Sequence, residues 1–192
     1  MATGNHDQGY PKELTLANGK HAKVRFMSRA DADLELQFAR ALPPDDLLFL
    51  RTDITDPATI DEWIKHIERG GTFTLLAEVD GELAGYASVH LNDTRWTRRI
   101  GEIRIQVGAA SRRTGLGRRL AREIFDLARA HGLKKITAQM TPDQVGARAV
   151  FEKLGFQVEA LLGDWVEDRL GRPRDLLVMT HDVDGFSDRV TA

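Results

Sequence analysis

Residues 107–120 read Val107-Gly-Ala-Ala-Ser-Arg112-Arg113-Thr114-Gly115-Leu116-Gly117-Arg118-Arg119-Leu120. A strand is predicted before them by β-favouring residues over 101–107, and a helix after them by apolar residues at helical spacing from Leu116. The start of a helix offers unpaired N–H groups and a partial positive charge, and glycines let the backbone come close to a phosphate. This strand-loop-helix junction is therefore predicted to bind an anion.

The glycines of this stretch match neither of two common nucleotide motifs. The Rossmann pattern G-x-G-x-x-G is absent, and so is the P-loop pattern G-x-x-x-x-G-K-S/T, because Gly117 is followed by Arg118-Arg119-Leu120. The nearby arginines add positive charge, although such charges are also typical of a solvated helix face. Dinucleotides and ATP are thus disfavoured as ligands.

Strand and helix patterns extend outward from this unit in both directions. The predicted strands cover residues 14–16, 22–26, 72–79, 83–91, 101–107, 134–140, 156–165 and 176–179. The predicted helices cover residues 34–42, 60–67, 116–131 and 144–154. Asn18-Gly19 and Asp80-Gly81 are typical of tight hairpin turns. One central strand-helix-strand unit among antiparallel hairpins indicates an α/β fold with a mixed, mostly antiparallel sheet and flanking helices.

Length and composition indicate one ordinary globular domain. The chain has 192 residues, 42% of them apolar and 29% charged, and a formal net charge of −2. We expect a disordered N-terminal tail over residues 1–11, a single domain over 12–183 and a flexible C-terminal tail over 184–192. No signal peptide or membrane-spanning run is evident, so a cytoplasmic location is expected.

The chain contains no cysteine. Disulfides, thiolate metal sites and cysteine nucleophiles are therefore excluded, and so is any acyl transfer that passes through an acyl-cysteine. The negative net charge and the few aromatic residues disfavour nucleic-acid binding through the arginine-rich loop.

Residues 107–120 resemble the coenzyme A loop of the GNAT acetyltransferase family, whose pattern is Gln/Arg-x-x-Gly-x-Gly/Ala. Arg112, Gly115 and Gly117 occupy the three defined places. Further on, residues 144–156 resemble the family's segment Asn-x-x-Ala…Tyr-Glu-Lys-Leu-Gly-Phe. The two matches come in the family's order with the expected strand between them, and the resemblance covers roughly Leu14 to Met179.

The resemblance implies that the chain uses acetyl-coenzyme A and no metal. It also implies that the strand ending at Val107 splays from its parallel neighbour, so that backbone N–H groups bind the pantetheine arm and the thioester carbonyl as an oxyanion hole. The residues expected to contact the cofactor are Gln106, Val107, Arg112, Arg113, Thr114, Gly115, Leu116, Gly117, Arg118, Gln144, Phe151 and Lys153.

Acetyl transfer to an amine requires a group that removes a proton from the amine. Glu102, Arg104 and Gln106 share one face of a predicted strand, and the family often has a glutamate there. Glu102 is therefore the candidate catalytic base, directly or through water, with pairing to Arg104 as its alternative role. His90 and Tyr86 on the preceding strand are reserve candidates.

Phe151 departs from the family pattern, because it stands where a tyrosine commonly protonates the leaving thiolate. Gln144 replaces the usual asparagine, which is a smaller change since both side chains carry an amide. Three outcomes stay open: water or buffer donates the proton, another residue does so, or catalysis has been lost.

The leading hypothesis is an N-acetyltransferase that moves acetyl directly to an amine in a ternary complex. The acceptor is a small molecule or a protein amine, and Trp63 and Trp96 are candidates to line its cleft. The alternative is a coenzyme A sensor without turnover, which Phe151 motivates. Nucleic acid and membrane are not expected as partners, and a homodimer is left open.

Overall fold

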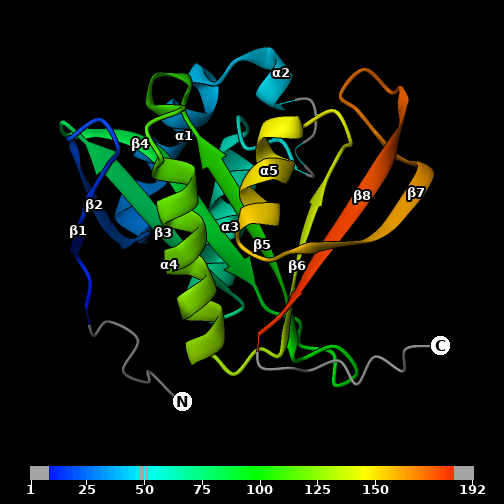
Figure 1. Ribbon diagram of the computed structural model, residues 1–192. Helices are drawn as coiled ribbons and strands as arrows, with labels where there is room; N and C mark the ends of the chain where they lie inside the picture. Colours follow the sequence, from blue (N-terminus) through cyan, green and yellow to red (C-terminus); the bar gives the residue numbers. More distant parts are fainter. Residues whose placement is uncertain (1–8, 48–49, 51, 184–192) are drawn as a thin grey trace.

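The computed structural model describes residues 9–47, 50 and 52–183, and it contains one eight-stranded sheet (Figure 1). The strands lie in the order β1-β2-β3-β4-β5-β6-β8-β7. They are β1 (Lys12–Thr15), β2 (His21–Phe26), β3 (Thr72–Val79), β4 (Glu82–His90), β5 (Ile100–Val107), β6 (Lys135–Met140), β7 (Gln157–Glu167) and β8 (Pro173–Asp182). The α-helices are α1 (Ala32–Ala41), α2 (Pro44–Leu47), α3 (Pro57–Glu68), α4 (Leu116–Ala130) and α5 (Val145–Lys153).

The predicted fold class is confirmed. Among the described strands only β5 and β6 pair in parallel, and all other neighbours are antiparallel. The hairpins β1–β2 and β3–β4 enclose Asn18-Gly19 and Asp80-Gly81, as their turn residues predict. Helix α2 is not predicted, because Pro43-Pro44 directly follows the predicted helix over 34–42 and favours the end of a helix. Pro44 instead begins a new helix, which suits a residue with no N–H to donate.

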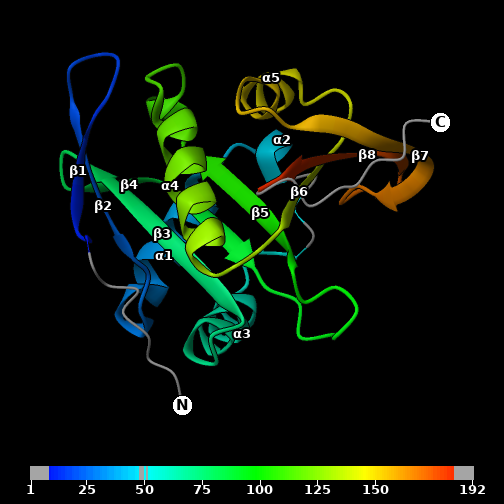
Figure 2. The same cartoon turned by 60° about the horizontal axis from the view of Figure 1, so that its bottom comes forward.

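Helices cover both faces of the sheet (Figure 2). Helix α4 and helix α5 lie on one face, and α1 and α3 lie on the other. The apolar stripe predicted for α4 is buried, including Leu116, Leu120 and Ile124, which are fully inaccessible. These residues belong to a core cluster under α4, whereas Ile60 and Ile64 of α3 belong to a second cluster on the opposite face.

The parallel pair β5–β6 is short, and this creates the central opening of the fold. Its register joins Ile100 to Lys135, Gly101 to Ile136 and Glu102 to Thr137, and pairing ends there. Beyond that point β5 stays paired with β4 as far as Val107, while β6 stays paired with β8. The two strands therefore diverge from a common end, as Figure 1 shows.

The described chain makes core contacts from Tyr10 onward. The ring of Tyr10 packs edge-on against Phe26 with centroids 5.0 Å apart, and the Tyr10 hydroxyl donates a hydrogen bond to Glu123 at 2.8 Å. Sequence reasoning had placed Tyr10 in the N-terminal tail, and a single aromatic gives no periodicity to reveal such docking. The expectations for residues 1–8 and 184–192 lie outside the described residues. Among the described helices none is long and apolar enough to cross a membrane.

Candidate functional site

The N-terminus of α4 is open to a ligand. Gly115 precedes the helix with φ of 85°, a left-handed conformation that favours glycine, and no side chain caps the helix. The first helical bond runs from the N–H of Arg119 to the carbonyl of Gly115, so earlier N–H groups have no partner within the helix. A Cβ atom at Gly117 would lie 3.4 Å from Val107, which is ordinary contact. The junction thus fits the predicted phosphate site.

The arginines around this junction lie in different environments. Arg112 forms an ion pair with Asp46 of α2, and Arg113 is exposed with φ of 61°. Arg118 lies in a separate cavity of about 410 Å³ beside the β1–β2 turn. That cavity is lined by Thr15, Leu16, Ala17, Thr114, Gly115, Arg118, Arg119 and Arg122. The side chain of Leu116 is buried in the core, so this residue can offer only its backbone to a cofactor.

A cavity of about 460 Å³ occupies the opening between β5 and β6. It is lined from both faces of the sheet, since α5 contributes on one side, and α2, whose Leu47 packs in the core cluster of α1 and α3, contributes on the other. We call it the gap cavity, and its lining residues are Asp46, Leu50, Tyr86, Glu102, Ile103, Arg104, Ile105, Gln106, Ala138, Gln139, Met140, Thr141, Gln144, Ala147, Phe151, Trp165, Val166, Glu167 and Leu176. The edge of β5 beyond Glu102 faces this space without a partner strand.

On the α5 side of the gap cavity, Gln144 and Phe151 stand where the sequence predicts them. The Oε1 atom of Gln144 accepts a hydrogen bond from the N–H of Thr141 at 3.1 Å, which orients the amide. Phe151 is 6% exposed and packs edge-on against Phe156, with centroids 5.0 Å apart. This wall therefore offers an apolar ring at the position where GNAT acetyltransferases commonly have a phenol.

Glu102 lies at the narrow end of the gap cavity. Its Oε1 accepts from Nε of Arg104 at 2.9 Å, so the alternative role as an ion-pair partner is present in the structure. The β4–β5 register places His90 opposite Glu102 and Tyr86 opposite Gln106. The side chains of Glu102, Arg104, Gln106, His90 and Tyr86 each line the gap cavity, a second cavity that adjoins it, or both.

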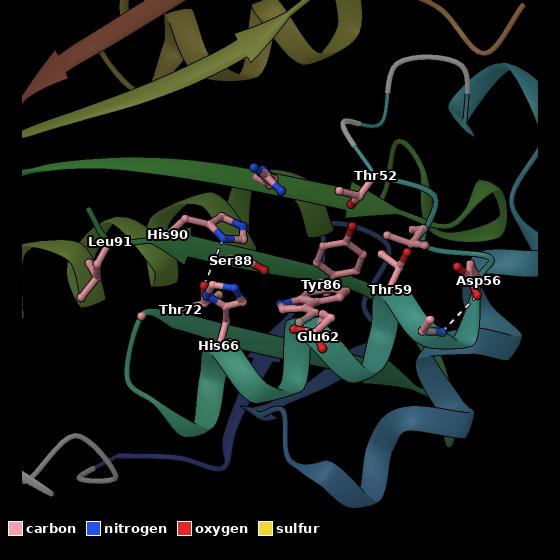
Figure 3. A pocket seen from close by; sticks show the side chains of 15 residues that line it. Thr52, Asp56, Thr59, Glu62, His66, Thr72, Tyr86, Ser88, His90 and Leu91 are labelled. Carbon is pink, nitrogen blue, oxygen red and sulfur yellow. Dashed lines mark hydrogen bonds between the residues drawn. The ribbon is translucent and has the colours of Figure 1, made fainter. Parts of the chain in front are cut away.

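The second of these cavities has a volume of about 600 Å³ and lies between α3 and β4 (Figure 3). We call it the α3–β4 cavity. Figure 3 shows Glu62 and His66 of α3 on one side and Tyr86, Ser88 and His90 of β4 on the other. Tyr86 and Arg104 line both cavities, so the two spaces meet there.

Tyr86 remains a neutral phenol at this junction. Burial raises its pKa, the nearby Glu35 carboxyl raises it further, and Arg104 acts in the opposite direction. Its ring is held between Trp63 and Phe38, at centroid distances of 5.0 and 6.2 Å. Trp63 also donates from Nε1 to Thr74 at 3.1 Å, so it is both a packing residue and part of the cavity wall.

The family model described as "Acetyltransferase (GNAT) family" matches residues 37–156, which include α4, α5 and the strands that form the opening. The chain belongs to the acetyltransferase (GNAT) family. It is accordingly an N-acetyltransferase that depends on acetyl-coenzyme A, and the resemblance stated from the coenzyme A loop is confirmed.

Solved structures share the GNAT fold. The protein yncA from Salmonella typhimurium, solved with its cofactor acetyl-CoA, is 24% identical, with a TM-score of 0.75 over 89% of this chain and 99% of that one. Ribosomal-protein-alanine N-acetyltransferase from Brucella melitensis is 25% identical (TM-score 0.72, 83% and 98% covered). A chimera of spermidine N-acetyltransferase SpeG from Vibrio cholerae and hSSAT is 20% identical (TM-score 0.69, 84% and 95% covered). The acceptors in these names differ, so the GNAT fold does not choose the acceptor.

Sequence reasoning did not name most of the residues that line the gap cavity, among them Asp46, Trp165 and Glu167. Only Gly163-Asp164 gave a signal, because such a pair inside a strand is typical of a bulge. Lys153 is exposed at the end of α5, and Trp96 is 93% exposed. Neither lines the cavities described above, and the described residues contain no cluster of three or more metal-ligating side chains.

Proposed function

We propose that this GNAT enzyme transfers acetyl directly to a small-molecule amine in a ternary complex at the gap cavity. The observation that carries the proposal is the divergence of β5 from β6 beside the uncapped start of α4. A strand edge without a partner and a helix start both present N–H donors, and the two lie at the ends of one continuous segment. A cytoplasmic location, as expected from the sequence, is part of this proposal.

The chain would hold acetyl-coenzyme A mainly through backbone groups. The N–H groups of residues 115–118 would bind the pyrophosphate, and the β5 edge from Ile103 to Val107 would bind the pantetheine arm together with the amide of Gln144. When bound, acetyl-coenzyme A supplies an activated thioester. N–H donors on the β5 edge would stabilise negative charge on its carbonyl oxygen.

Glu102 is proposed as the base that accepts the proton of the acceptor amine. An alkylamine has an ordinary pKa of ~10.4, so most of it is protonated at neutral pH and it must be neutralised before attack. Arg104 positions the carboxylate through its bond to Oε1. His90 lies across the β4–β5 ladder from Glu102 and is the reserve base.

Protonation of the leaving thiolate is assigned to water in this proposal. The chain has two tyrosines, and Tyr10 is tied to Glu123 by its hydroxyl. Tyr86 lines the gap cavity, but its raised pKa makes it a weak acid toward a thiolate with a pKa near ~8.5. Phe151 has no proton to give.

Thiol release tests the proposal. The protein is incubated with acetyl-coenzyme A and a panel of amines, and free thiol and acetylated amine are measured together. We expect stoichiometric formation of both, with no release when the amine is omitted. Thermal stabilisation by acetyl-coenzyme A without thiol release from any amine would instead indicate a binding module, the alternative that Phe151 motivates.

A further inference from the structure

Strand β7 brings an aromatic and an acidic side chain to the gap cavity. Trp165 and Glu167 both line it, together with Val166 between them. Trp165 is 65% exposed. An exposed indole on a cavity wall offers a large rigid surface that is not used for packing the core.

Trp165 lies in a bulge of β7. Leu162 pairs with Leu176 and Val166 pairs with Arg174, so residues 163–165 stand opposite Asp175 alone. Within the bulge Asp164 has φ of 49°, and its N–H donates to Oδ1 of Asp175 at 3.0 Å. Bulges re-aim the side chains beside them and recur next to active sites.

Carboxylates outnumber cations on the wall of the gap cavity. Glu102 pairs with Arg104, which is the one guanidinium among the described lining residues, and Asp46 pairs with Arg112 of the phosphate loop. Glu167 adds a third carboxylate, which is exposed. Because Glu102 and Asp46 are paired with arginines, Glu167 supplies the excess negative charge of this wall, which attracts cations and repels anions.

We propose that Trp165 and Glu167 determine acceptor specificity by binding a second positive charge, so that the preferred acceptors are small aliphatic diamines. One amine reacts near Glu102, and the other, as an ammonium, lies against the indole face and the Glu167 carboxylate. A cation over a tryptophan face is attracted by the ring, and a carboxylate adds a charge-assisted hydrogen bond. This inference rests on the proposed function, because it assigns the β7 side of the cavity to the acceptor.

The test compares three amines of equal chain length: 1,4-diaminobutane, butylamine and 4-aminobutyrate. We expect kcat/KM to fall in that order, with about tenfold between the first two. Glu167→Gln and Trp165→Leu should each lower the ratio of kcat/KM for the diamine to that for butylamine about fivefold. Glu13→Gln removes an exposed carboxylate from β1 and serves as the control that leaves this ratio unchanged.

Equal kcat/KM for the diamine and butylamine would overturn the inference and leave the proposed function standing. A diamine preference that survives both variants would also overturn it. If no amine releases thiol, the proposed function fails, and calorimetry on the protein saturated with coenzyme A still tests the subsite. In that case equal Kd values for 1,4-diaminobutane and butylamine would overturn the inference.

Discussion

The two sides of the β5–β6 opening are built in different ways. On the side proposed to bind coenzyme A, one continuous segment from Ile103 to Arg118 supplies a strand edge, a loop and a helix start. On the acceptor side, the lining side chains come from α2, β4, β5 and β7, which are far apart in the sequence. The first site is made mainly of backbone groups, and the second mainly of side chains.

This difference teaches where each kind of substitution should act. Changes in the coenzyme A segment should alter acetyl-coenzyme A affinity for every acceptor, because the backbone donors are common to all reactions. Changes on the acceptor side should alter kcat or acceptor preference and leave acetyl-coenzyme A affinity unchanged. The following predictions test that separation, beginning with the largest expected effect.

Gly117→Glu should abolish acetyl-coenzyme A binding. A Cβ atom at position 117 would make only an ordinary contact with Val107, so the domain should still fold. The new carboxylate, however, would face the phosphates at the start of α4. Like charges in a binding site cost several kcal/mol, which corresponds to a loss of about 100-fold or more in affinity. Calorimetric titration of the folded variant gives the Kd.

Ala130→Glu is the matched control, since it adds the same group to the exposed last turn of α4. It should bind acetyl-coenzyme A like the parent protein. An unchanged Kd in Gly117→Glu would refute the phosphate site, and removing Arg113 alone should have a much smaller effect.

Glu102→Gln should lower kcat by about 100-fold, in the range expected for loss of general-base catalysis. The amide keeps the shape and can still accept a hydrogen bond from Arg104, so the Kd for acetyl-coenzyme A should not change. The increase of kcat with rising pH should also weaken. Full activity with the parental pH profile would make Glu102 structural and His90 or a water chain the better candidate.

Glu35 should make the free energy of unfolding depend on pH. It is fully buried in α1, neither oxygen has a hydrogen-bond partner among the described residues, and burial followed by repulsion from Asp31 raises its pKa to about 8. The folded protein therefore binds a proton more tightly than the unfolded chain. This stabilisation is complete below the ordinary pKa of 4.5 and is lost as the pH rises through about 8.

Urea unfolding at a series of pH values measures this effect. Between pH 6 and 8 the free energy of unfolding should fall by about 2 kcal/mol. Glu35→Gln should remove most of that slope, whereas Glu13→Gln on the exposed edge should keep it. A parental slope in Glu35→Gln would mean that another group titrates.

Much of the fold could be predicted from the sequence because its signals are local. The stripe of Leu116, Leu120 and Ile124 predicted α4, and Asn18-Gly19 predicted the first hairpin. Helix α2 and the docking of Tyr10 were not predictable in this way. A four-residue helix has no periodicity, and the contact of Tyr10 with Glu123 joins residues far apart in the chain.

The candidate site divides along the same line. Gly115 precedes α4 with a left-handed φ of 85° that favours glycine, so at this position the residue type itself indicates the local backbone. The pair Asp46–Arg112 and the wall formed by Trp165 and Glu167 depend on how α2 and β7 are placed around the gap cavity. No local pattern records such packing, so these residues emerge only from the structure.

Phe151→Tyr is expected to have the smallest effect. A phenol in the gap cavity could protonate the thiolate, and kcat at neutral pH should rise if that step limits the rate. The gain should stay well below the ~10²–10⁴-fold of an aligned general acid, because this cavity is packed around a phenylalanine. Phe156→Tyr, on the neighbouring ring outside the cavity lining, should give no gain. A fall in kcat for Phe151→Tyr with unchanged affinity would show that the apolar wall itself is required.

Backbone hydrogen exchange, with and without saturating acetyl-coenzyme A, tests the central claim most directly. The claim is that the cofactor occupies the unpaired edge of β5 and the start of α4. Exchange should slow at amides of residues 103–107 and 115–118 and stay unchanged in β2 and β3, whose pairing does not involve the opening. Unchanged exchange at residues 103–107 in the saturated protein, or protection confined to α1 and α3, would contradict the account.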